Sequence, residues 1–403
     1  MKLSRFMAAA AERAPVVVLQ VNYANGLTLI RDLERQGVPV LGLDPNPRAL
    51  GLHSRLAAGM LCPDPLDDEE AFVLFLEELG EWLPQKAVVF PTHDEYIWPL
   101  SRHADRLSPW YLIPFARWPV MERLYDKRAQ LEAAARAGCA IPRTVYLESE
   151  DDLGRVDDIE YPGILKPVDS LAFRRRFFTN VRAVEGPDHV RRIWPQIADL
   201  GGMVLQERVP GADDQLFTVG SYLDRESRPL AIFTGHKLRQ HPRGAGSCTL
   251  GVSRWDEALA RSAVDLLQEL KYWGVSQVEY KRDPRDGRLR LMEINARHWL
   301  WHSLAAVSGV NLSYVAYRDA IGTPFLAPRQ KDGAKWIVAT KDLPLALRDV
   351  WRRQLSPLEV MRSLSGLRLD GVLTPRDPVP SLLNTARIAR QIVTLQPSKR
   401  VQP

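Results

Sequence analysis

The chain has 403 residues, of which 45% are hydrophobic, so it is long enough for two or three domains with cores of their own. The 54 basic and 49 acidic residues leave a net charge of only +5, which disfavours a nucleic-acid-binding protein. No stretch approaches the roughly 20 apolar residues of a membrane span. The cysteines Cys62, Cys139 and Cys248 show neither a pairing pattern nor metal-ligand spacing, which indicates a reduced, cytoplasmic setting.

Predicted strands and helices alternate over the first 120 residues. An apolar strand is predicted at 16–20, a helix at 26–35, a strand at 39–43, an acidic helix at 69–82 and a strand that begins at Lys86. Alternation of this kind predicts a parallel α/β sheet over residues 14–120.

The loops of this region allow two further hypotheses. Asp44 ends the second strand about where a ribose-binding acid would stand, but the first loop has the single glycine Gly26, which does not favour dinucleotide binding. Thr92 and Glu95 have the spacing of a helix capping box, while His93 or Asp94 could face a substrate at the end of the strand.

In the middle of the chain, the strict alternation of strands and helices ends. A helix is predicted from Met121 to Gly138, followed by strands in "IPRTVYL" and "YPGILKPV", a helix at 189–200 and a strand in "GMVLQERV". The segments "DQLFTVGSYLD" and "RPLAIFTGHKLRQ" alternate like paired antiparallel strands, and a helix is predicted from 255 to 272.

The segment 275–297, "VSQVEYKRDPRDGRLRLMEINAR", predicts a hairpin that turns at 283–287. In the register that we predict, Arg282 lies opposite Arg288 and Glu279 opposite Leu291. Glu279 and Glu293 then share a strand face with Asn295 and Arg297. Two carboxylates and an amide oxygen suit Mg²⁺ completed by substrate phosphates. A solvated charged strand face is the alternative, although asparagine is disfavoured in strands.

This hairpin resembles the metal-binding hairpin of the ATP-grasp family, which has a Glu on one strand and Glu-x-Asn-x-Arg on the next. Four other segments resemble motifs of the same family and occur in the same order. Lys127 in "YDK" resembles the first phosphate-contacting lysine of that family, and Lys166 in "ILKP" the second. "VLQERVPG" (204–211) resembles the hinge strand that holds adenine, and "GHKLRQHPRGAGSC" (235–248) a segment of the carboxylate–amine ligase branch related to carbamoyl-phosphate synthase.

The resemblance implies an α/β and α+β protein in which a parallel-sheet pre-ATP-grasp domain (1–120) precedes an ATP-grasp small lobe (121–205) and a C-terminal lobe (206–330). It also implies a site, the members of which are as follows: ATP contacts at Lys127, Lys166, Gln206, Glu207, Val209 and Asp214 (or Asp213), metal ligands at Glu279, Glu293 and Asn295, and catalytic or substrate contacts at Arg297, Lys237 and Arg239, with His236 as a further nominee.

The implied reaction is the ATP- and Mg²⁺-dependent (or Mn²⁺-dependent) activation of a carboxylic acid as an acyl phosphate, and its attack by an amine to form an amide or peptide bond. A thiol, hydroxyl or bicarbonate substrate, or a regulatory nucleotide-binding module, are the alternatives. The partners expected are the small acid and amine, with a homodimer left open. Cys248 is expected to be a bystander.

Two segments depart from the family or extend beyond it. Family members commonly have a glycine-rich loop after the second lysine, whereas "VDSLAFRRRFFTN" has no glycine and three arginines, 174–176, which suit phosphate, an acidic partner or solvent. From Lys331 onward the chain has 13 basic and 6 acidic residues, a net of +7. We expect this extension (331–403) to end in an amphipathic helix that packs on the core, with a partner or membrane surface as the alternative.

Overall fold

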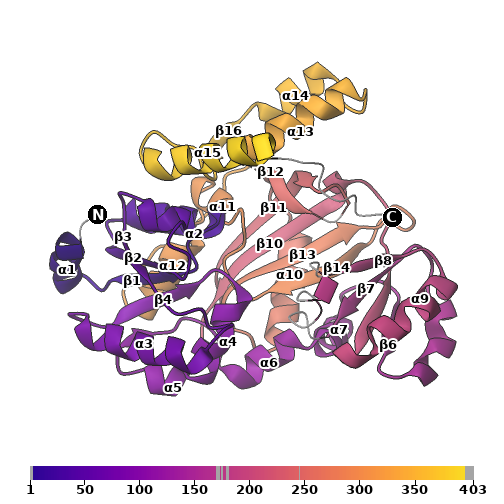
Figure 1. Cartoon of the computed structure of the whole chain (residues 1–403), viewed down its shortest axis with the longest axis horizontal. Helices are drawn as coiled ribbons and strands as arrows, with labels where there is room; N and C mark the ends of the chain where they lie inside the picture. Colours follow the sequence, from indigo (N-terminus) through magenta and orange to yellow (C-terminus); the bar gives the residue numbers. More distant parts are fainter. Residues whose placement is uncertain (1–2, 169–172, 174–175, 178–180, 245, 395–403) are drawn as a thin grey trace.

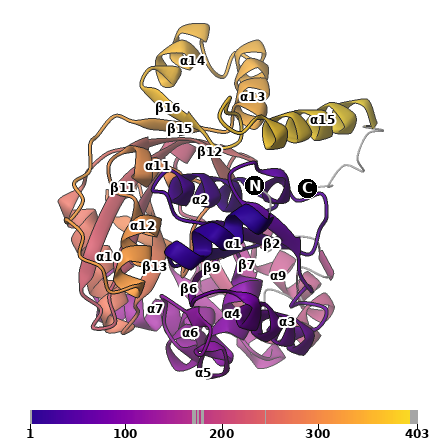
Figure 2. The same cartoon turned by 90° about the vertical axis from the view of Figure 1, so that its left-hand side faces the viewer.

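The protein is built on three β-sheets in a computed structural model, which describes residues 3–168, 173, 176–177, 181–244 and 246–394. Figure 1 shows a parallel sheet formed by the N-terminal part of the chain on the left, a small sheet on the right and a long central sheet between them. The last helices lie along the top of the molecule. In the turned view of Figure 2 the N-terminal helices lie in front of the central sheet.

The N-terminal sheet is parallel, as predicted, and its five strands have the order β3-β2-β1-β4-β5. All residues of β1, β2 and β4 are buried, as expected for parallel strands covered on both faces. The short strands β3 and β5 were not predicted. The elements are α1 (Leu3–Glu12), β1 (Val16–Leu19), α2 (Ala24–Glu34), β2 (Val40–Asp44), η1 (Leu50–His53), β3 (Ala58–Leu61), α3 (Glu69–Trp82), β4 (Ala87–Pro91), α4 (Asp94–Arg102), α5 (Ala104–Leu107) and β5 (Tyr111–Leu112).

Close packing explains the single glycine of the first loop. A Cβ atom on Gly26 would lie 2.7 Å from the carbonyl oxygen of Gln20, so only glycine lets α2 begin this near to the end of β1. The predicted capping box at Thr92 is wrong, because α4 begins at Asp94 and Thr92 is buried. Its hydroxyl contacts the Gln20 carbonyl oxygen at 2.7 Å and thereby ties β4 to β1.

The second sheet is antiparallel, with the order β6-β9-β7-β8. The helix predicted before it is two helices, because the Asp126 side chain accepts hydrogen bonds from the N–H groups of Arg128 and Ala129 and starts a new helix at Lys127. The elements are α6 (Trp118–Tyr125), α7 (Lys127–Arg136), β6 (Thr144–Leu147), η2 (Glu150–Asp158), β7 (Gly163–Pro167), β8 (Arg182–Val184), α9 (Pro187–Ile193), η3 (Trp194–Gln196), η4 (Ala198–Leu200) and β9 (Met203–Glu207).

The central sheet has seven strands in the order β14-β13-β10-β11-β12-β15-β16. The segment after Lys331, expected as an extension, supplies two of these strands, and β12 was also not predicted. The elements are η5 (Asp213–Gln215), β10 (Leu216–Leu223), β11 (Pro229–His241), β12 (Ser247–Ser253), α10 (Glu257–Glu269), β13 (Gly274–Arg282), β14 (Leu289–Asn295), α11 (Ser303–Val307), α12 (Leu312–Ala320), β15 (Lys335–Ile337), α13 (Ala339–Trp351), α14 (Pro357–Leu364), β16 (Leu367–Asp370) and α15 (Pro378–Thr394). In the described part of the chain, no helix is both long and apolar enough to cross a membrane.

Two buried tryptophans fix the segment that follows β14. A Cβ atom on Gly220 of β10 would lie 2.1 Å from the Trp299 ring, and one on Gly251 of β12 would lie 2.7 Å from the Trp301 ring. The glycines therefore leave a bare patch on the sheet for the two indoles. This packing holds the turn that contains Arg297 against the end of the sheet.

Candidate active site

The β13–β14 hairpin contains a bulge that was not predicted. Arg282 pairs with Leu289, not with Arg288, and Tyr280 pairs with Leu291. The register then shifts at Met292, so that Glu279 lies directly opposite Glu293. The extra residue turns Leu291 toward the core with Tyr280 while Glu293 points to the opposite face, beside Glu279.

Glu279 is held by three donors on this face. The Lys237 ammonium lies 2.8 Å from Glu279 Oε1, and the Gln277 amide donates to the same oxygen at 3.0 Å. The Thr218 hydroxyl is 3.4 Å away. Burial opposes the charge of Lys237, but the Glu279 carboxylate outweighs it and raises the pKa of Lys237. Glu279 and Lys237 therefore form a fixed, buried ion pair.

Two lysines from the second sheet and its helix approach Glu293. Lys127 Nζ, at the start of α7, lies 3.7 Å from Glu293 Oε1. Lys166, on β7, donates to Gln206 Oε1 at 2.7 Å. Removal from bulk solvent opposes ionisation of Glu293, but Lys127, Lys166 and Arg297 outweigh it and lower the pKa of Glu293. Burial, with the neighbouring Lys127, lowers the pKa of Lys166 to about 8. Two cations from one lobe thus face a carboxylate of the other.

The strand predicted to hold adenine is β9 with the residues that follow it. Glu207 is buried, and both of its oxygens are engaged: Oε1 accepts from the Arg143 backbone N–H at 3.0 Å and Oε2 from Arg285 at 3.1 Å. The Val209 carbonyl accepts from Lys281 Nζ at 2.9 Å. Glu207 therefore braces this strand, and its carboxylate is not free to accept from a base as predicted.

Arg297 connects the hairpin with the N-terminal sheet. Its guanidinium donates to Asp94 Oδ1 at 2.8 Å, and its Nη2 donates to Asn295 Oδ1 at 3.0 Å. Burial opposes the charge of Arg297, but Asp94 outweighs it and raises the pKa of Arg297. Arg297 lies beyond the end of β14 and still continues the row of Glu293 and Asn295.

Arg239 does not join this cluster. An irregularity in β11 pairs Lys237 with Gly251 but Arg239 with Leu250, so the two side chains do not share a face as simple alternation would require. Arg239 instead donates to Asp342 of α13 at 2.9 Å and to Ser363 of α14 at 2.6 Å. The structure thus separates Lys237, which lies in the cluster, from Arg239, which binds the tail.

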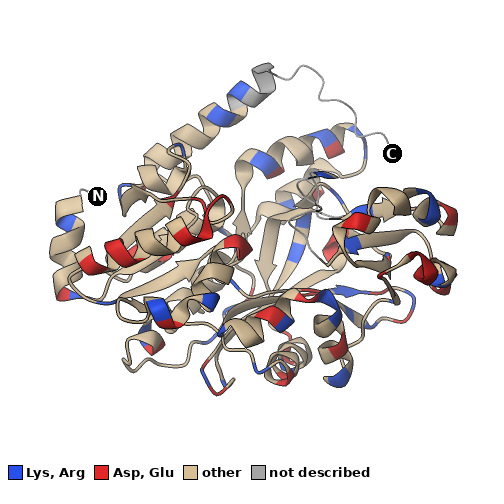
Figure 3. Ribbon diagram, turned by 60° about the horizontal axis from the view of Figure 1, so that its bottom comes forward, with Lys and Arg blue, Asp and Glu red and all other residues tan. Residues whose placement is uncertain are grey.

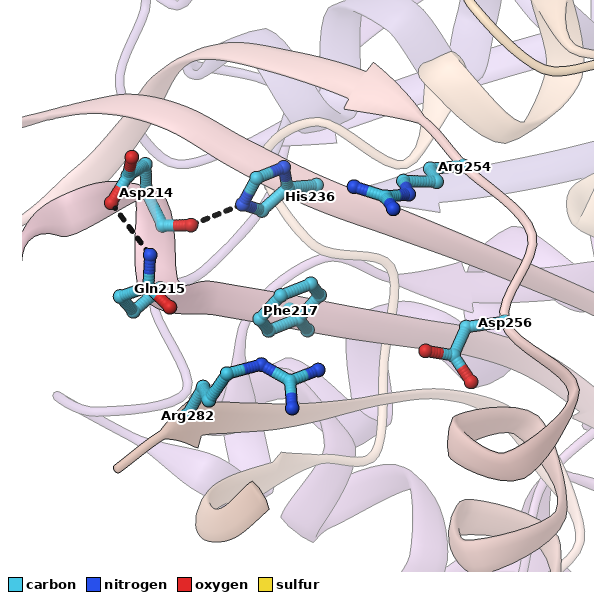
Figure 4. A pocket seen from close by; sticks show the side chains of 7 residues that line it. All are labelled: Asp214, Gln215, Phe217, His236, Arg254, Asp256 and Arg282. Atoms are coloured by element: carbon cyan, nitrogen blue, oxygen red, sulfur yellow. Dashed lines mark hydrogen bonds between the residues drawn. The ribbon is translucent and has the colours of Figure 1, made fainter. Parts of the chain in front are cut away.

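Asp214 and His236 lie on the other face of the central sheet. Figure 4 shows them at a pocket of about 280 Å³ that is also lined by Gln215, Phe217, Arg254, Asp256 and Arg282. Phe217 stacks on His236. The next residue of β10, Thr218, points to the opposite face, where it contacts Glu279. Asp213 is bound to Gln240 and to the Gly244 N–H. The geometry does not bring Asp214 or His236 to the lysine–glutamate cluster.

Two other expectations can be placed, and one residue of the cluster was missed. Cys248 is buried in β12, and burial raises the pKa of its thiol well above the usual range, as expected of a bystander. Arg176 pairs with Asp199 at 2.7 Å, while Arg174 and Arg175 lie outside the described residues. Gln277 was missed by the sequence analysis, although it stands two positions before Glu279 and alternation puts it on the same strand face.

The donor set fits a divalent cation that a substrate completes. Over the described ranges there is no group of three or more His, Cys, Asp or Glu residues that could hold a metal by themselves. Glu279, Glu293 and Asn295 instead offer two carboxylates and one amide on neighbouring strands. Mg²⁺ is commonly bound in this way, by one or two carboxylates together with phosphate oxygens.

Comparison with known proteins agrees with this geometry. Residues 244–327 match the family described as carbamoyl-phosphate synthase L chain, ATP binding domain. The chain is 24% identical over 277 residues to the D-aspartate ligase of Enterococcus faecium strain Aus0004, a match that covers 64% of this chain and 66% of that protein, slightly under two thirds of its length.

Two solved structures show the same fold. N5-carboxyaminoimidazole synthetase from Staphylococcus aureus with ADP superposes with a TM-score of 0.62 at 15% identity, over 85% of this chain and 86% of that one. L-amino acid ligase from Bacillus licheniformis superposes with a TM-score of 0.59 at 14% identity, over 80% and 79%. The chain therefore shares its overall fold with these two proteins, and its residues 244–327 resemble an ATP-binding domain of the carbamoyl-phosphate synthase type.

Proposed function

We propose that the protein is an ATP-dependent ligase that activates a carboxylic acid as an acyl phosphate and joins it to an amine, releasing ADP and phosphate. The observation that carries the proposal is the contact of Lys127 with Glu293 across the two lobes, beside Lys166. Cations on one lobe and acids on the other are what a nucleotide triphosphate and its metal require at one place. The similarity to D-aspartate ligase and L-amino acid ligase supports an amide product.

In this proposal each described residue has a task set by its position. Lys127 and Lys166 bind phosphate oxygens, and Gln206 holds Lys166 in place. The backbone near Val209 binds adenine, with Glu207 as the brace behind it. Glu279, Glu293 and Asn295 would hold Mg²⁺ or Mn²⁺, which would offset the charge of the phosphates when bound. Lys237 holds the Glu279 carboxylate in place through their ion pair, and Arg297 offers its guanidinium to the acyl phosphate.

Domain limits, cellular location and three unassigned residues complete the proposal. The domain limits at 120, 205 and 330 remain our proposal for the pre-ATP-grasp domain, the two lobes and the tail. A cytoplasmic protein is supported by the use of ATP and by the three cysteines, none of which is in a disulfide. We do not assign Asp214, His236 or Arg239 to the reaction, because each has another position or partner.

A screen for ADP release tests the proposal. The purified protein is mixed with ATP, Mg²⁺ and pools of carboxylic acids and amines, including acidic amino acids, and ADP is measured with Glu293→Gln as the blank. ADP release that needs both an acid and an amine supports the ligase. Formation of AMP with a confirmed substrate pair, or ADP release that needs no acid, contradicts it.

A further inference from the structure

Helices α13 and α14 form a hairpin whose outward face is apolar. Leu347 is 67% exposed, Trp351 83% and Met361 70%. Leu343 and Leu358 are also exposed. Leu343, Leu347 and Trp351 recur every four residues and so line one side of α13. Figures 1 and 2 show that the two helices project from the body above the central sheet. Exposed aromatic and aliphatic side chains grouped in this way mark an interaction surface.

The inward side of α13 is polar, which is the reverse of an ordinary surface helix. Asp342 and Asp349 are buried, and they accept hydrogen bonds from Arg239 and from Arg243 at the end of β11. The helix is therefore anchored to the sheet by ion pairs, and its leucines and tryptophan are left for the outside. Packing of a core does not explain their position.

The exposed charges around the apolar face are six cations and one acid, Glu359. The side chains of Lys341, Arg348, Arg352, Arg353, Arg362 and Arg368 are exposed between residues 339 and 368. Of the three acids in that span, Asp342 and Asp349 are turned inward, and Glu359 caps α14 by accepting from the Ser356 N–H. Figure 3 shows that basic and acidic residues both occur along the ribbon in the rest of the molecule. The hairpin is a local exception.

We propose that the α13–α14 hairpin docks on an anionic lipid surface, with Leu347, Trp351 and Met361 entering the headgroup region and the arginines binding lipid phosphates. An apolar face with a basic rim is the composition of helices that lie in a membrane interface, where tryptophan is favoured. A second copy fits less well, because a symmetric pairing of this face would bring two basic rims together. This site is separate from the ligase site and does not depend on it.

Sedimentation with lipid vesicles tests the proposal on the full-length protein. Vesicles of phosphatidylcholine alone are compared with vesicles that contain about 30% phosphatidylglycerol, a density of negative charge near that of anionic membranes. We expect binding to the anionic vesicles, loss of most of it in high salt, and at least about tenfold weaker partition to the neutral ones. Protein that stays in the supernatant with anionic vesicles overturns the proposal.

Variants separate the two parts of the surface. Leu347→Ser with Trp351→Ser removes the apolar part and should lower partition at least about tenfold, while Arg352→Gln with Arg353→Gln should lower it roughly 25-fold, about fivefold for each charge. Leu326→Ser (Leu326 is 93% exposed) and Arg261→Gln are the matched controls outside the hairpin and should bind like the wild type. All these side chains are exposed, so unfolding temperatures should not change.

Two results would refute the assignment. Unchanged vesicle binding in the Leu347–Trp351 double variant would show that the hairpin is not the docking surface. Light scattering that finds a dimer of the wild type and a monomer of this variant would show that the face joins two copies of the chain.

Discussion

Arg297 and Asp94 are joined by a bidentate ion pair, with Nε–Oδ1 at 2.8 Å and Nη2–Oδ2 at 3.2 Å, although they stand 203 positions apart in the chain. Asp94 begins α4 in the N-terminal unit, and Arg297 follows the metal-binding hairpin that we propose. The N-terminal unit therefore contacts the proposed reaction centre through the Asp94 side chain. The pair fixes where the guanidinium can point.

Asp94→Asn should lower turnover with little effect on nucleotide binding. The amide cannot accept two hydrogen bonds from Arg297 with the charge of a carboxylate, so the guanidinium loses its orientation, which costs roughly 2–3 kcal/mol, about 30- to 150-fold in kcat/KM for the acid. Steady-state kinetics and ATP calorimetry measure the two quantities. Equal losses in both would show that Asp94 acts on the fold and not on Arg297.

Arg297→Ala should reduce acyl phosphate formation more than ATP binding. With a confirmed acid and no amine, hydroxylamine traps the acyl phosphate as a hydroxamate, and we expect at least a tenfold lower yield from the variant because the developing charge has lost its donor. Arg297→Lys should not restore it, since an ammonium lacks the planar fork that binds both oxygens of Asp94 and also reaches Asn295. Full trapping by Arg297→Ala would exclude the role that we propose.

Glu293→Gln should stop ADP release and leave the fold intact. Glu293 is 48% exposed, so its neutral replacement strands no buried charge and should change the free energy of unfolding by less than about 1 kcal/mol. Glu279→Gln should differ, because it leaves the buried Lys237 without its anion and should lower the unfolding temperature as well. The comparison of activity and melting for the two variants checks both roles. Near-wild-type ADP release from Glu293→Gln at ordinary Mg²⁺ concentration is incompatible with the metal assignment.

ATP binding should weaken as the pH rises through the pKa of Lys166. This pKa is lowered to about 8, so Lys166 is charged at pH 7 and largely neutral well above pH 8 in the free protein. Because phosphate favours the ammonium form, binding at pH 9 must take up a proton, and affinity should fall up to about tenfold for each pH unit above 8. Calorimetry in two buffers of different ionisation enthalpy measures that uptake. Lys166→Arg, which stays charged, is the control, and proton uptake unchanged in it would assign the effect to another group.

Asp377→Asn should destabilise the protein strongly. Asp377 is fully buried, and it accepts from Arg31 at 3.2 Å, from the Ser54 hydroxyl at 2.9 Å and from the Arg55 N–H at 3.1 Å. Loss of its charge leaves Arg31 buried without a counterion, which costs roughly 3–5 kcal/mol. Urea unfolding gives the value. Arg376→Gln, in an exposed pair with Glu34, should cost less than about 1 kcal/mol and serves as the control.

The sequence predicts which residues meet at the candidate site better than it predicts the register of the hairpin. Lys166 in its apolar strand and the alternation of Glu293 with Asn295 depend on local pattern, and both are placed where that pattern indicates. The bulge at Met292 was missed, yet it has a signature: the buried positions of β14 move from Leu291 to Ile294, an odd spacing that plain alternation forbids. Local alternation predicts which face of the sheet each side chain is on, and a bulge moves the side chains after it to the other face.

Contacts between distant segments could not be predicted from local pattern. Arg239 and Lys237 were both predicted to contact substrate, but the irregularity in β11 and the buried Asp342 direct Arg239 to the tail. Asp94 was weighed only as a residue at the end of a strand. Its pairing with Arg297 depends on how the first sheet sits against the third, which no single segment specifies.

Because β15 completes the central sheet, the chain cannot be shortened at residue 330 without an unpaired edge. Leu250, Gly251 and Val252 of β12 would lose their partners Ile337, Trp336 and Lys335, and the chain would present a bare apolar strand to its neighbours. Such edges pair between molecules and lead to aggregation. A version of the protein made for expression trials should therefore end after α15, or keep at least the residues through β16, and insolubility of the 1–330 fragment would say nothing about whether its ATP site can form.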